Sequence, residues 1–178
     1  VQVSVLYTPD YASNAEPVLQ ATIDSLDYFS KTLGGYPYTT VTAVVPPYGA
    51  DEAGGMEYPT FFTADSTGQD QPGTLGRFAL DFVTVHEFGH GYFYGILASN
   101  EFEEPMLDEG MNEYWDQRMM TARKQDIVLS TPWLKPYGIG TRITPFQMER
   151  LGANLDDPAD PLGGNSWARL SSGSYGTV

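Results

Sequence analysis

The two histidines of the chain, His86 and His90, lie in the segment VHEFGHG and are four residues apart. In a helix, side chains at this spacing lie on the same face, so the two imidazoles can bind one tetrahedral ion. Glu87 lies beside that face and can reach a water molecule bound there, which is the arrangement of a His-Glu-x-x-His metallopeptidase. The alternative is a helix that carries three polar residues and binds no metal, and the pentapeptide alone does not decide between the two.

The sequence on either side of the two histidines favours the metal site. The run from about Leu75 to Leu97 is apolar on most sides, so we expect a buried helix. Burying two histidines and a glutamate in such a helix is costly unless something compensates for their polarity, and a zinc ion is the natural compensation. The chain has no cysteine, so any metal must be held by His, Asp or Glu.

Glu109 is the candidate for the third ligand that catalytic zinc usually takes. It follows His90 after 18 intervening residues, near the start of a second predicted helix from Pro105 to about Arg123. An antiparallel pair of helices could bring Glu109 back to the ion. We therefore expect one zinc ion per chain, bound between two helices.

Further acidic residues flank Glu109. Glu113 and Asp116 share its helical face, and they could accept a hydrogen bond from the free ring N–H of His86 or His90, or form a solvated acidic face. Four acids precede Glu109, and their spacing lacks the alternating carboxylates and the central glycine of a calcium loop. We expect these four to form a solvated acidic loop: Glu101, Glu103, Glu104 and Asp108.

The elements that must position these residues begin with an alternating stretch at residues 1–10, which predicts a strand. An amphipathic helix is expected from Ser13 to Gly34, with capping-box spacing between Ser13 and Glu16. Its apolar residues recur at helical spacing: Leu19, Ile23, Leu26, Phe29 and Leu33. The β-branched segment from Tyr38 to Tyr48 predicts a second strand, which leads through a glycine-rich turn into a third, short strand in GGMEYPTFF.

Composition limits the class of protein. The 178 residues suffice for one ordinary domain or a piece of a larger one, and a content of 41% hydrophobic and 13% aromatic residues excludes disorder. A net charge of −14 makes nucleic acid an unfavourable ligand. The chain starts without Met and stops abruptly at Val178, so we expect a segment of a longer polypeptide. No feature assigns a cellular compartment.

Three motifs in this order resemble one family. HEFGH, then 18 residues and the glutamate of LDEG, together with GGMEY upstream, are similar to the gluzincin zinc aminopeptidases of the aminopeptidase N and leukotriene hydrolase type. The similarity extends over roughly Val1 to Arg123 and more loosely beyond. It implies an α+β fold, a fragment of a thermolysin-like zincin catalytic domain. A small mixed sheet within residues 1–65 would pack beside the zinc helix pair of residues 75–123, and residues 124–178 would form a truncated, loop-rich part.

The resemblance also implies roles for single residues. His86, His90 and Glu109 would bind zinc, and Glu87 would be the general base. Glu57 would contact the free α-amine of a peptide substrate, within a substrate-binding turn that comprises Gly54, Gly55, Met56 and Glu57. The implied reaction is removal of N-terminal amino acids from peptides. From the residues alone, Glu57 could equally be an ordinary polar residue in a glycine-rich turn.

The chain departs from the family at several positions. Tyr58 stands where the motif usually ends in Asn, which bears on how the substrate backbone is held, and MLDEGM replaces a Trp-Leu-Asn-Glu-Gly-Phe-like sequence. Gly91 replaces a glutamine and bears on the pocket behind the zinc helix. The family uses a downstream tyrosine that is followed closely by Lys-Gly. We expect that residue beyond Val178, with Tyr175 as its neighbour.

Two alternatives remain open at the level of sequence. The chain could belong to a zinc endopeptidase, because zinc and a glutamate base serve both kinds of peptidase. It could also be a zinc-binding scaffold that is inactive alone, because the resemblance places further domains of the same polypeptide outside this chain.

Overall fold

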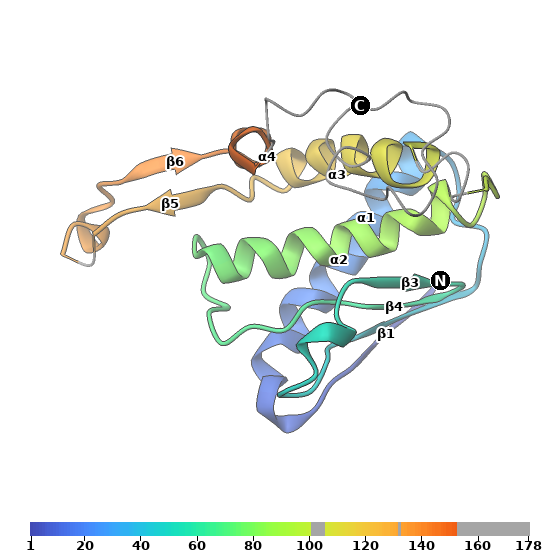
Figure 1. Cartoon of the computed structure of the whole chain (residues 1–178), viewed down its shortest axis with the longest axis horizontal. Helices are drawn as coiled ribbons and strands as arrows, with labels where there is room; N and C mark the ends of the chain where they lie inside the picture. The colour runs from blue at the N-terminus through green and yellow to red at the C-terminus, as the bar shows by residue number, and fades with distance from the viewer. Residues whose placement is uncertain (101–105, 132, 153–178) are drawn as a thin grey trace.

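A computed structural model describes residues 1–100, 106–131 and 133–152. Within these ranges the chain has an α+β fold with four α-helices, a mixed four-stranded sheet and a separate two-stranded hairpin (Figure 1). No helix in this part of the chain is long and apolar enough to cross a membrane. Tyr175, named above as the neighbour of an expected catalytic residue, lies outside the described residues.

The four-stranded sheet brings the glycine-rich turn to the zinc helix predicted from the sequence. Its strands have the order β1-β2-β4-β3, in which β1, β2 and β4 are parallel and β3 is antiparallel to β4. The sheet is therefore mixed, as predicted, and β3 with Glu57 forms its edge. Strand bounds are β1 Gln2–Leu6, β2 Thr40–Val44, β3 Met56–Tyr58 and β4 Phe61–Thr63.

Helix α1, Ala15–Thr32, connects the parallel strands β1 and β2, as a parallel pair requires. The predicted helix is confirmed, but two details were wrong. Its buried face includes Val18, Ala21 and Phe29, whereas Ile23 is 40% exposed, because the apolar spacing fits more than one face. The expected capping box is not used. The residue before the helix is Asn14, whose side chain bonds the backbone N and O of Thr67 instead (2.8 and 2.9 Å).

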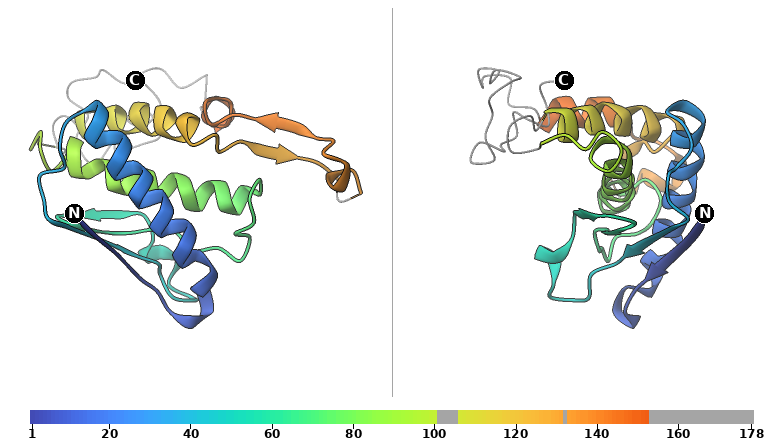
Figure 2. Two further views of the ribbon diagram at one scale, coloured as in Figure 1. Left: turned by 180° about the vertical axis from the view of Figure 1, so that it is seen from behind. Right: turned by 90° about the vertical axis from the view of Figure 1, so that its right-hand side faces the viewer.

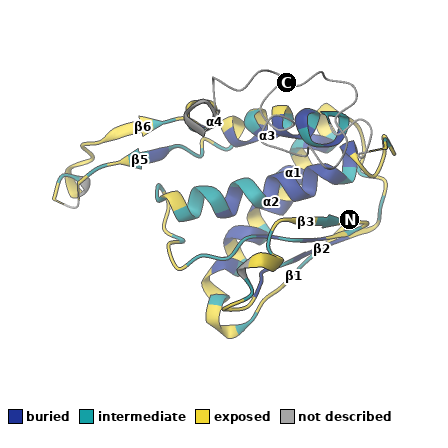
Figure 3. Cartoon of the chain, viewed as in Figure 1, coloured by how far each residue is buried: buried dark blue, intermediate teal, exposed yellow. Residues whose placement is uncertain are grey.

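Helix α2, Leu75–Phe93, lies at the centre of the molecule. Thr74 caps its start by accepting a hydrogen bond from the Arg77 N–H (3.2 Å). The helix ends four residues before the predicted Leu97, because Gly95 N–H bonds the carbonyl of His90, five residues back, in a wider turn (2.8 Å). The sheet, α1 and α3 pack around α2 from different sides (Figure 2), so its C-terminal half is buried on most sides (Figure 3).

Helix α3, Met111–Ala122, runs antiparallel beside α2, as predicted for the pair (Figure 1). A π-helical turn, Met106–Gly110, precedes it and carries Glu109. In the described residues beyond α3 the chain forms a hairpin and a short helix. These elements are β5 Ile127–Leu129, β6 Thr141–Ile143 and α4 Pro145–Gly152.

An aromatic cluster forms much of the core beneath α2. Phe29 of α1 stacks on Phe88 of α2 with ring centroids 6.0 Å apart, and Tyr36 stacks on the same ring at 5.4 Å. Tyr92 contacts both Phe29 and Tyr36. Burial of each large apolar side chain contributes about 1.5–3 kcal/mol to the stability of the fold, so this cluster anchors the helix segment that carries both histidines.

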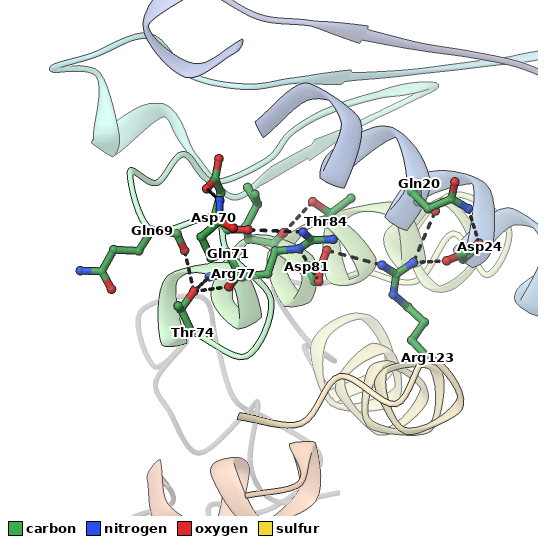
Figure 4. A network of polar contacts seen from close by, with 11 residues as sticks. Gln20, Asp24, Gln69, Asp70, Gln71, Thr74, Arg77, Asp81, Thr84 and Arg123 are labelled. Carbon is green, nitrogen blue, oxygen red and sulfur yellow. Dashed lines mark hydrogen bonds and ion pairs between the residues drawn. The ribbon is translucent and has the colours of Figure 1, made fainter. Parts of the chain in front are cut away.

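A polar network ties three helices together at the other end of α2 (Figure 4). The fully buried Asp81 of α2 accepts hydrogen bonds from Arg77 (2.9 Å) and Arg123 (3.5 Å). Arg123, just after α3, also pairs with Asp24 of α1 and bonds the carbonyl of Gln20 (3.4 Å). A buried carboxylate needs such partners, so the network fixes how α1, α2 and α3 are spaced.

We expect Arg123→Met to lower the free energy of unfolding by about 2 kcal/mol, because Asp81 keeps Arg77 but loses its second cation. Urea unfolding followed by circular dichroism measures the change. The matched control is Lys31→Met, which breaks the exposed pair with Asp27 and should cost less than about 0.5 kcal/mol. Equal losses in the two variants would contradict a structural role for the network.

Candidate metal centre

The two histidines and Glu109 meet at a single point. His86 Nε2 lies 3.2 Å from His90 Nε2 and 3.2 Å from Glu109 Oε2, and His90 Nε2 lies 3.6 Å from Glu109 Oε2. Both histidines are buried and Glu109 is partly buried. The structure thus brings together the three residues that were predicted from the sequence as metal ligands. They come from two different helical segments and form a group that could hold a metal ion.

Carboxylates fix the orientation of both imidazole rings. His86 Nδ1 lies 2.7 Å from Asp116 Oδ2, and His90 Nδ1 lies 2.6 Å from Asp108 Oδ1. Since a carboxylate only accepts, Nδ1–H is the donor in each pair, and the Nε2 lone pairs are left to face Glu109. Three acceptor atoms that face one another at this spacing require a positive charge between them.

The pKa shifts of the two histidines also indicate a site that favours positive charge. Burial by itself lowers the pKa of His86, but Asp116 and Glu109 more than offset this and raise that pKa well above its ordinary value. Burial is also the largest single influence on His90 and lowers its pKa, but the hydrogen bond to Asp108 and the negative charges of Asp108 and Glu109 together outweigh it, so the net direction is again upward. The site therefore favours a bound cation, either protons or a metal ion that displaces them.

Asp108 corrects the expectation of a solvated acidic loop. It is 0% exposed and bonded to His90, whereas Glu101, Glu103 and Glu104 lie outside the described residues. Asp108 lies in the π-helical turn Met106–Gly110, and such wide turns recur at functional sites. Sequence periodicity gives no signal for a π-helical turn, which is why the burial of Asp108 was missed.

Glu113 and Asp116 are also buried, so a solvated acidic face is the wrong description of them. Asp116 makes the bond to His86 that was one of the two expected roles. Glu113 Oε2 lies farther from the ring, 3.7 Å from His86 Nδ1, and its other oxygen accepts a hydrogen bond from Gln117 (3.1 Å). Glu113 therefore adds negative charge behind His86 without replacing Asp116.

Glu87 lies beside the metal-ligand group. Its side chain is buried, and its Oε2 has no hydrogen-bond partner among the described residues. Burial raises its pKa to about 7, with Glu57 and Glu109 adding to the rise and the two histidines opposing it. A carboxyl group in this state can take up and release a proton near neutral pH.

Glu57 approaches Glu87 and His90 from the edge strand β3, and one ligand atom from each lies within 4.8 Å of the others. Burial raises the pKa of Glu57 as well. The turn before β3 depends on Gly55, which has φ +67° and donates its N–H to the carbonyl of Thr63 (3.0 Å). A side chain at Gly55 would also contact Glu87, because its Cβ would lie 3.5 Å from Glu87 Oε1.

The other two residues of the predicted substrate-binding turn are placed less specifically. Gly54 leads into the turn, and Met56 begins β3 with an exposed side chain. Tyr58, at the position where the family motif has Asn, stacks on Phe61 of the same hairpin with centroids 4.7 Å apart. Its ring therefore packs along the edge of the sheet.

A small pocket of about 30 Å³ opens beside Glu57, Glu87 and His90. Aromatic rings form much of its wall: Tyr36, Tyr38, Tyr58, Phe61, Phe62, Phe88 and Tyr94. Gly91 makes room for one of them, because a Cβ there would lie 3.2 Å from the Tyr36 ring. The absence of a side chain at Gly91 thus shapes this pocket. This is the position at which the aminopeptidase family usually has a glutamine.

No protein-family model matches the chain, and no curated protein matches it significantly. The resemblance to the gluzincin aminopeptidases therefore depends on the three motifs and on the arrangement of their residues.

We expect Asp108→Asn to weaken binding of a divalent metal by about 10- to 100-fold, because the amide keeps the size but not the charge that orients His90. Competition with a chromogenic chelator, with Zn²⁺ and Co²⁺ as probe ions, measures the affinity. His86→Ala should abolish binding, and Asp10→Asn, on the surface far from α2 in sequence, should leave it unchanged. Unaltered affinity in Asp108→Asn would mean that this carboxylate does not orient a ligand.

Proposed function

We propose that this chain is the catalytic core of a zinc metallopeptidase that removes N-terminal amino acids from peptides. The observation that carries the proposal is the triangle formed by His86 Nε2, His90 Nε2 and Glu109 Oε2, with sides of 3.2, 3.2 and 3.6 Å. For bonds of about 2.0–2.1 Å, the ligand atoms of a tetrahedral zinc ion lie about 3.3–3.4 Å apart. Two imidazoles and one carboxylate suit zinc, whereas Mg²⁺ and Ca²⁺ prefer oxygen ligands alone.

His86, His90 and Glu109 would hold the zinc ion, which would supply a water nucleophile with a pKa lowered to about 7 and would polarise a carbonyl group. Asp116 and Asp108 keep His86 and His90 in the orientation that binding requires. Glu109 supplies the negative ligand from the neighbouring helical segment.

Glu87 is the general base in this proposal. Its unpartnered Oε2 and its pKa of about 7 suit a group that accepts a proton from the attacking water and passes it to the leaving amine. The aromatic wall of the adjacent pocket excludes water from part of this region, which strengthens the interaction of Glu87 with charged groups.

Glu57 directs the reaction to the first peptide bond. A carboxylate at the sheet edge, close to both Glu87 and His90, can pair with a protonated N-terminus and place the first carbonyl group at the metal. The net charge of −14 further favours a cationic end group over an anionic one. The peptide substrate with a free N-terminus is thus the partner that we propose.

We expect Glu87→Gln to retain about the same zinc content as the wild-type chain but to lose at least about 100-fold in kcat, because the amide cannot accept the proton. The measurement pairs metal analysis with hydrolysis of aminoacyl-arylamides. Glu52→Gln, an exposed residue ahead of the turn, is the control and should change neither quantity.

Full activity in Glu87→Gln would refute this mechanism. If the wild-type chain binds zinc but does not turn over substrate while a longer polypeptide that includes it does, the chain is a metal-binding scaffold that needs further domains. Those two results separate the base assignment from the completeness of the site.

We expect peptides with a free N-terminus to be cleaved much faster than the same peptides with an N-acetyl group. Glu57→Gln should reduce this preference by about 10- to 100-fold, mainly through KM, because a charge-assisted hydrogen bond to the amine is lost. Mass spectrometry of the products identifies which bond is cut. Efficient internal cleavage of the acetylated peptide by the wild-type protein would instead identify an endopeptidase.

A further inference from the structure

Gly89 follows His86 by three residues, about one turn of α2, and lies on the side of that helix that faces α3. Another side chain occupies the space beside it. A Cβ at Gly89 would lie 2.0 Å from Oδ1 and 3.0 Å from Cγ of Asn112 on α3, so no larger residue fits while Asn112 stays in place. Glycine lets the two helices approach closely at this point.

Asn112 uses this close approach to bond the zinc helix directly. Its side chain is 0% exposed, and its Nδ2 donates to the backbone carbonyl of His86 at 2.8 Å. The contact defines the orientation of the amide, because a carbonyl requires the donor end of the group. Asn112 therefore holds α3 to the residue of α2 that carries the first histidine ligand.

The position of Asn112 along α3 connects this contact to the metal centre. Glu109, which reaches His86 Nε2, is three residues earlier, and Asp116, which reaches His86 Nδ1, is four residues later. Residues at these offsets share one face of a helix. The contact of Asn112 with α2 thus lies between two carboxylates that approach His86: Glu109 in the turn before α3 and Asp116 in α3.

We propose that Asn112, seated over Gly89, is a positioning residue of the metal centre: it sets the distance between α2 and α3 at which Glu109 and Asp116 both reach His86. This inference rests on the proposed metal-dependent function. It assigns a joint role to Gly89, the second variable position of HEFGH, and to Asn112 of the following helix, a role that neither residue has alone.

The test is a double-mutant cycle of Asn112→Ala, Gly89→Ala and the combined variant, with Zn²⁺ affinity and the visible absorption spectrum of bound Co²⁺ as readouts. Asn112→Ala should weaken Zn²⁺ binding by about tenfold or more and alter the Co²⁺ spectrum, since Glu109 is no longer held in place. Gly89→Ala should weaken it similarly, because its Cβ displaces Asn112. In the combined variant the new methyl group occupies space left by Asn112, so the loss should be smaller than the product of the two single losses.

Asn14→Ala is the matched control. Asn14, just before α1, is also fully buried and makes two backbone hydrogen bonds, but to Thr67 in the loop between β4 and α2. Its replacement should lower the melting temperature and leave both Zn²⁺ affinity and the Co²⁺ spectrum unchanged. A general loss of stability would affect both asparagine variants alike, whereas the positioning role predicts a difference in the metal readouts.

Several results would overturn the inference. Wild-type Zn²⁺ affinity in Asn112→Ala, or strictly multiplicative effects in the combined variant, would show that the contact does not position the centre. If Asn112→Ala fails to fold, Gly89→Ala still decides, because alanine is the better helix former and wild-type affinity in that variant would contradict the proposal. Failure of the wild-type chain to bind Zn²⁺ would instead contradict the proposed function.

Discussion

The need to compensate buried charge at the end of one apolar helix governs this molecule. His86, Glu87 and His90 are all buried on α2, and a buried ionisable group is stable only when another group pairs with it. The surrounding elements provide those partners. The turn before α3 contributes Asp108 and Glu109, α3 contributes Asp116, and the sheet edge contributes Glu57.

The same helix is held by quite different means at its two ends. Near the histidines, aromatic rings from α1 and from the loop before β2 pack against Phe88, so that end is fixed mainly by apolar contact. Near the start, the buried Asp81 is held by Arg77 and Arg123, which fix orientation through hydrogen bonds. Rigid support of both kinds suits a site whose ligand atoms must remain within a few tenths of an ångström of their geometry.

Sequence reasoning succeeded where a local pattern determines the outcome. The buried helix around His86 and the partner that brings Glu109 back were expected from apolar spacing and motif order, and the mixed sheet was expected from the family resemblance. It failed where long-range packing decides. The face that α1 buries depends on which neighbours it meets, and Asn14 bonds a loop 53 residues away instead of capping its helix.

The candidate metal centre shows the same contrast between local pattern and long-range packing. The candidate ligands could be named from spacing, but the role of Asp108 could not, because it depends on the π-helical turn that places Asp108 against His90. Asn112 gave no signal either, since an asparagine in a helix is ordinarily a solvated residue and its role depends on the glycine that faces it.

The charge of the site limits what it can bind besides a metal ion. Six carboxyl groups gather around only two histidines: Glu57, Glu87, Asp108, Glu109, Glu113 and Asp116. A divalent ion offsets two negative charges, and burial keeps part of the remainder protonated, as the pKa of about 7 for Glu87 illustrates. Because six carboxyl groups exceed the two charges that a divalent ion would offset, an excess of negative charge remains at the site. A ligand that brings its own positive charge reduces that excess, whereas a neutral or anionic end group does not, and this asymmetry favours a free amino terminus at the proposed site.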